Sequence, residues 1–160
     1  MLMSRTCKLF TSLKTLGINP KMTTFAERKK VQKLVYLMDK VFGMGFSFPY
    51  SWYLHGPYSP EVTKIVFDVI EGRQAVDVNQ EVLSDRDRAR IDRLRSFLGK
   101  DIDSNDELEL LVSLHFLIER SRNPKLTTKD VVDFLKSKKP YFTDEEIAEA
   151  IDKLRSLEHQ

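Results

Sequence analysis

One run of residues resembles the start of a calcium-binding loop. Asp101, Asp103 and Asn105 occupy alternate positions, as the first oxygen ligands of an EF-hand do. The sixth position of such a loop is glycine and the twelfth is a bidentate glutamate, but these positions hold Asp106 and Val112. The run therefore favours an acidic helix N-terminus, stabilised by the helix dipole, over a metal site.

Histidine and cysteine have no spacing typical of a catalytic or metal site. His55, His115 and His159 are far apart, and the single Cys7 has no second thiol with which to bind zinc. No neighbouring base is evident that would activate Cys7 as a nucleophile, and no glycine-rich phosphate loop is present. We expect no catalysis, no cofactor and no metal. His115 lies in an apolar helical run, which favours a hydrogen-bonded core histidine.

A basic stretch at the start of the predicted central helix is the first candidate binding surface. Cations there oppose the helix dipole, so their placement indicates contact with an acidic ligand or with nucleic acid. A solvated face whose lysine stems cover the core is the competing interpretation. The predicted basic contact face consists of Lys29, Lys30, Lys33, Tyr36 and Lys40.

The second candidate is an aromatic stretch over residues 46–60 that contains a Gly-Pro pair. Aromatic side chains with polar tips are favoured in protein interfaces, and loops often carry function. The alternation of residue types also indicates that one side of this stretch belongs to the core. The predicted partner-binding residues are Tyr50, Trp52, Tyr53, His55, Gly56, Pro57 and Tyr58.

The same two stretches carry a family resemblance. The run from Lys30 to Leu37 (KVQKLVYL) and the run from Trp52 to Glu61 (WYLHGPYSPE) resemble the uncharacterised YwgA-like proteins of bacteria and archaea. More distantly, they are similar to the Panacea domain of SocA-like antitoxins. The resemblance covers residues 25–72. It implies a helical domain that binds a protein partner without catalysis, and it extends to Lys33, Tyr36, Gly56 and Pro57.

Caps and hydrophobic spacing predict the elements that position these residues. Thr24 and Glu27 form a capping-box pattern before a helix that ends at Gly43, and Ser59-Pro60 begins the next helix. Alternation predicts a strand over residues 46–54, with Pro49 at an edge or a bulge and Gly56-Pro57 ending it. A second strand over residues 75–82 is predicted to pair with it. Ser, Thr and Asn caps predict four further helices, over residues 85–98, 105–120, 128–138 and 144–157, and Thr143 with Glu146 repeats the capping-box pattern before the last of them.

These elements predict a mainly α fold: a compact domain of six or seven helices with a minor two-stranded β element. Residues 22–160 form the predicted helical domain. Residues 1–21 are an amphipathic extension or an added helix, dispensable if the chain starts at Met22. With one cysteine and no long apolar run, the sequence favours the cytoplasm and predicts no transmembrane segment.

The charge is unevenly distributed along the chain. Residues 1–80 contain 11 basic and 6 acidic side chains, whereas the second half is acidic. The sequence thus predicts a non-catalytic, regulatory protein-interaction module. The alternative is a winged-helix-like regulator that binds nucleic acid through its basic N-terminal half.

Overall fold

Polar caps begin the helices of the computed structural model, which describes residues 4–20, 23–79, 82–121 and 127–159. Seven α-helices form within these residues, and a hydroxyl at the N-cap accepts a backbone N–H in six of them. Their bounds are α1 Arg5–Thr15, α2 Phe25–Tyr36, α3 Pro60–Ile70, α4 Asp85–Leu98, α5 Asn105–Arg120, α6 Thr128–Lys138 and α7 Asp144–Ser156.

The two predicted capping boxes have different outcomes. Thr143 and Glu146 form the predicted reciprocal pair at the start of α7. At the start of α2, the Thr24 hydroxyl accepts the Glu27 N–H (3.1 Å), but the Glu27 carboxylate turns to Thr23 instead. Half of that prediction is therefore wrong, because the Thr23 N–H and hydroxyl together offer Glu27 two donors, each at 3.0 Å.

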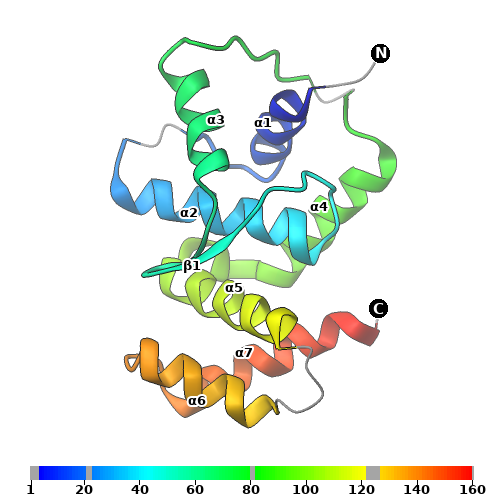
Figure 1. The fold of residues 1–160 in the computed structure, drawn as a ribbon. Coiled ribbons are helices and arrows are strands. Elements are labelled where there is room, and N and C mark those ends of the chain that lie inside the picture. The colour runs from blue at the N-terminus through cyan, green and yellow to red at the C-terminus, as the bar shows by residue number, and fades with distance from the viewer. Residues whose placement is uncertain (1–3, 21–22, 80–81, 122–126, 160) are drawn as a thin grey trace.

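Helices α2 and α5 form the centre of the molecule (Figure 1). Helix α5 has apolar residues all round its axis because it packs against α2 on one side and against α6 and α7 on the other. Helix α2 continues into a π-helical turn, Leu37–Val41, before the chain turns at Gly43. This arrangement confirms a mainly α fold with a minor β element.

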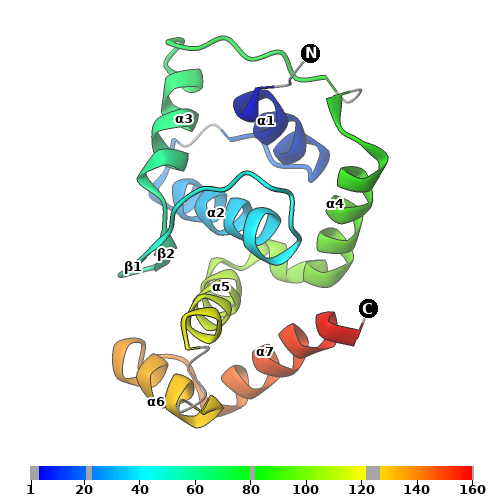
Figure 2. The same ribbon diagram turned by 45° about the vertical axis from the view of Figure 1, so that its right-hand side comes forward.

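Helix α1 lies in the same core as the later helices. Its Leu9 and Leu13 side chains are fully buried, and the views in Figures 1 and 2 place α1 beside α2, α3 and α4. Residues 4–20 therefore contribute apolar surface to the core of the folded chain.

The β element is a hairpin, and the predicted pairing is wrong. Strand β1 (Ser51–Tyr53) pairs antiparallel with β2 (Gly56–Tyr58), and the Gly-Pro pair predicted to end the first strand lies inside β2. Residues 75–79 form no strand, and residues 80 and 81 of that prediction lie outside the described residues. β1 pairs with the residues that follow it directly because Gly56 adopts a positive φ of 100°, which permits a tight turn through Leu54 and His55.

The first half of the predicted strand forms no strand, and Ser47 within it has a positive φ of 59°. Phe46 and Phe48 are buried in the core, which produces the alternation in the sequence. Their segment does not pair with another strand, because the Asp39 carboxylate accepts the N–H groups of Ser47 and Phe48, each at 3.0 Å. None of the described helices is long and apolar enough to cross a bilayer.

Candidate functional site

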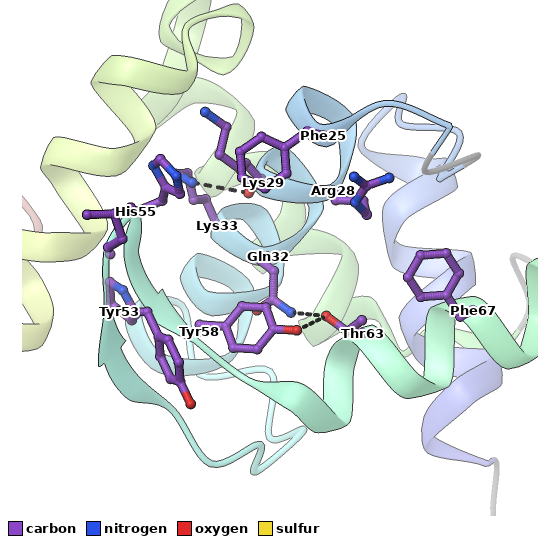
Figure 3. Close-up of a pocket in the computed structure, with 13 residues that line it drawn as sticks. Phe25, Arg28, Lys29, Gln32, Lys33, Tyr53, His55, Tyr58, Thr63 and Phe67 are labelled. Atoms are coloured by element: carbon purple, nitrogen blue, oxygen red, sulfur yellow. Dashed lines mark hydrogen bonds between the residues drawn. The ribbon is translucent and has the colours of Figure 1, made fainter.

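A pocket of about 410 Å³ lies between α2, the hairpin and the start of α3, as Figure 3 shows. Its size falls within the usual range for ligand sites, roughly 300–1,000 Å³. The lining consists of Phe25, Arg28, Lys29, Gln32, Lys33, Tyr53, Leu54, His55, Gly56, Pro57, Tyr58, Thr63 and Phe67.

Gln32, on α2, links the walls of this pocket by side-chain hydrogen bonds. Its amide oxygen accepts the Ser59 N–H (3.0 Å), and its amide nitrogen donates to the Ser59 carbonyl and to the Thr63 hydroxyl (2.8 Å each). The Tyr58 hydroxyl donates to the same Thr63 oxygen (2.9 Å), so the ring is held against α3 (Figure 3). Because these bonds join α2, β2 and α3, the pocket is pre-formed.

Gly56 brings the hairpin close to α5. A Cβ at this position would lie 3.0 Å from the Ser113 Oγ, and the positive φ would strain any residue with a side chain. Two structural features therefore require glycine at position 56: its positive φ and the close approach of the hairpin to α5.

Behind the hairpin lies a buried cluster of two lysines and one glutamate. Lys33, Glu109 and Lys139 are exposed by 2%, 5% and 1%. Glu109 lies 3.7 Å from the Lys139 ammonium and 3.5 Å from His55 Nδ1, and it accepts a hydrogen bond from the Tyr141 hydroxyl. Lys139 also donates to the Leu54 carbonyl at the hairpin turn.

Positive charge is in excess in this cluster. Burial is the main cause that lowers the pKa of Lys33 to about 8; attraction by Glu109 opposes it, and repulsion by Lys29 and Lys139 adds to it. Burial also lowers the pKa of Lys139, again against the attraction of Glu109. The pKa of His55 is lowered by partial burial and by Lys29, which favours the neutral ring. The Glu109 carboxylate is thus the main negative charge near both buried lysines.

The predicted basic contact face is divided by the structure. Lys29 and Lys33 line the pocket, and Lys33 is buried rather than solvated. Lys30 points toward Asp103 (3.8 Å), and Lys40 lies beside Asp39 (3.8 Å). Tyr36, also buried, hydrogen-bonds to His115 Nδ1 (2.8 Å), so Lys33 and Tyr36 do not belong to a solvated face.

Five of the predicted partner-binding residues line the pocket: Tyr53, His55, Gly56, Pro57 and Tyr58. The other two pack inward. Tyr50 meets Tyr36 edge to face with ring centroids 4.9 Å apart, and Trp52 stacks on Phe116 at 6.1 Å. Their rings therefore support the hairpin and are not part of the pocket wall.

Several residues of the site were missed from the sequence. Phe25 and Phe67 come from the helices on either side, and no spacing links them to the hairpin. Glu109 did carry a signal, because it is a charged residue within the apolar run from Leu108 to Val112. A charge placed there has to be paired, and a search for its partner would have led to the buried lysines.

The other predicted polar groups have structural partners. His115 is hydrogen-bonded, as predicted, through the Tyr36 hydroxyl, but it is only partly buried. In the calcium-like run, Asp101 forms an ion pair with Lys153. Within the described ranges, no three His, Cys, Asp or Glu side chains are grouped as metal ligands would be.

Comparison with known proteins adds no relative. No protein-family model, curated protein or solved structure matches the chain. The resemblance to YwgA-like and SocA-like proteins over residues 25–72 therefore stays a prediction.

Proposed function

We propose that this protein is a non-catalytic interaction module that binds a segment of a protein partner at the pocket and its rim. The observation that carries the proposal is the exposure of large apolar side chains around the opening. Phe25, Tyr53 and Leu54 are exposed by 54%, 51% and 79%, whereas most large apolar residues of the chain are buried. Exposed apolar surface beside a cavity is typical of interaction sites.

The rim favours a peptide segment over a small molecule. Tyr53 and Leu54 line the cavity and still expose large apolar surfaces, so a ligand confined to the cavity would leave much of that surface in water. A partner segment that crosses the opening covers the rim and can place one side chain inside. Aromatic anchors seated at a pre-formed pocket are the usual source of binding energy in such complexes.

The titratable groups nearest the pocket support a binding role. Glu109, the buried acid, already faces Lys139, His55 and Tyr141. Its charge holds the hairpin and the segment after α6 against α5, which is structural work. We propose that the module is regulatory, acts in the cytoplasm and, following its family resemblance, binds a toxin-like protein.

Nucleic-acid binding has less support as the alternative. Lys30 and Lys40 do not line the pocket, and each lies 3.8 Å from an acid, Asp103 and Asp39 respectively. Helix α7 begins with Asp144, Glu145 and Glu146, which would repel phosphates. The basic residues of the N-terminal half thus do not form one continuous face.

Selection from a random peptide library displayed on phage tests the proposal with the full chain as bait. Enriched peptides are synthesised with a fluorescent label, and their affinities are measured by anisotropy. We expect Tyr53→Ser and Leu54→Ser to weaken binding at least about tenfold, because each removes exposed apolar surface from the rim.

Ile118→Ser is the matched control, because Ile118 is an exposed apolar residue that does not line the pocket. It should bind the peptides as the wild type does. The proposal fails if no peptide is enriched, or if the rim variants and the control bind equally well.

A further inference from the structure

We infer that the partner segment carries an acidic side chain, Asp or Glu, which enters the pocket and pairs with Lys33, flanked by an aromatic or aliphatic residue that packs on the rim. The inference rests on the proposed function and names the chemistry of the ligand. Three observations support it: the charges of the lining, the environment of Lys33, and the apolar walls.

The lining has positive charge and no acid of its own. Among the thirteen residues are Arg28, Lys29 and Lys33, while Asp and Glu are absent from the set. A cavity with apolar walls concentrates the field of such charges, so it attracts an anion more strongly than an open surface would.

Lys33 is the group that an incoming carboxylate would meet in the pocket wall. Its ammonium donates to the Lys29 carbonyl at a long 3.4 Å, and among the described residues it has no ion pair. Glu109 already has Lys139, His55 and Tyr141 as partners. A buried cation whose nearest acid is shared gains more from a new anion than a solvated surface lysine does.

The walls beside Lys33 fit the apolar part of the ligand. The Phe25 ring meets His55 edge to face at 5.3 Å, and Tyr53 meets Tyr58 in the same way at 5.1 Å. Figure 3 shows Phe25 and His55 on one side of Lys33 and Tyr53 and Tyr58 on the other, with Gln32 and Tyr58 both bonded to Thr63. An acidic residue next to an apolar one matches this order of surfaces.

The test compares each enriched peptide with a copy in which its acid is replaced by the matching amide. We expect the enriched peptides to share an Asp or Glu beside an aromatic or aliphatic residue. The wild type should bind the amide copy at least about tenfold more weakly than the acidic peptide. The Lys33→Met variant should bind the two peptides with equal affinity. Lys30→Met is the matched control on the same helix, and it should keep the full preference for the acid.

Different results separate the two proposals. Peptides that need Tyr53 and Leu54 but tolerate the amide would overturn this inference and leave the proposed function standing. Displacement of the acidic peptide by a single-stranded oligonucleotide or by inorganic phosphate at equal concentration would also overturn it, since the pocket would then prefer phosphate. If the chain instead self-associates through the pocket, gel filtration will show Lys33→Met abolishing a dimer, which contradicts a distinct partner.

Discussion

Replacing Lys33 by methionine should stabilise the protein near neutral pH. Lys33 is buried, and its pKa is lowered from 10.5 to about 8, mainly by loss of solvation. At about 1.4 kcal/mol for each factor of ten in acidity, keeping Lys33 charged in the folded state costs about 3 kcal/mol. Methionine fills a similar volume without the charge, so most of this cost disappears in the variant.

The stabilisation should shrink as the pH rises. Because the folded pKa lies below the unfolded value, the unfolded chain binds more protons between the two, and the wild type gains stability there with pH. We expect a difference between variant and wild type of about 3 kcal/mol at about pH 7 and about 1.5 kcal/mol at about pH 9.5. The charged groups that set this pKa beside burial are Glu109 and Asp106 on α5, Lys29 on α2, and Lys139 after α6.

Urea unfolding followed by circular dichroism at the two pH values measures both effects. Lys30→Met provides the comparison, because Lys30 is only half-buried and points toward the exposed Asp103. Its stability should stay within about 0.5 kcal/mol of the wild type at both pH values. A Lys33→Met protein that is less stable than the wild type at neutral pH, with a difference that does not vary with pH, would refute the argument that Lys33 is a desolvated cation.

Four other changes test the framework of the site. Gly56→Ala should cost about 1–3 kcal/mol in thermal unfolding, because φ is positive and the new Cβ would crowd Ser113; an unchanged midpoint would contradict this. Glu109→Gln should destabilise by about 3–5 kcal/mol, since two buried lysines lose their shared anion. Asp39→Asn should cost about 1.5–3 kcal/mol by weakening two charge-assisted bonds to the following loop, and urea titration checks both acids. Deleting residues 1–21 should lower the thermal midpoint sharply and broaden the transition in calorimetry, because a buried helix face leaves the core. An unchanged midpoint would mean that the extension is dispensable.

The hairpin shows how a correct local pattern can lead to a wrong pairing. Alternation over residues 46–54 marks which side chains face the core, and Phe46 and Phe48 are indeed buried. Alternation does not say what the backbone bonds to, and here Asp39 takes the place of a neighbouring strand. Residues 56–58, and not 75–82, pair with β1 because the chain makes a tight turn just before Gly56. A Gly-Pro pair can end a strand or follow such a turn, and alternation alone does not distinguish the two.

The starts of α4, α5 and α7 were determined by the local sequence, because the caps Ser84, Ser104 and Thr143 each accept a backbone N–H three residues away. The aromatic hairpin was likewise visible, since its residues are neighbours in the chain. The buried charges were decided by the tertiary structure. Lys33, Glu109 and Lys139 come from segments far apart in the sequence, and of the three only Glu109, inside an apolar run, signals its own burial. Packing of α2, α5 and the segment after α6 removed the water around them, and that loss of solvation turned ordinary surface charges into the distinctive feature of the site.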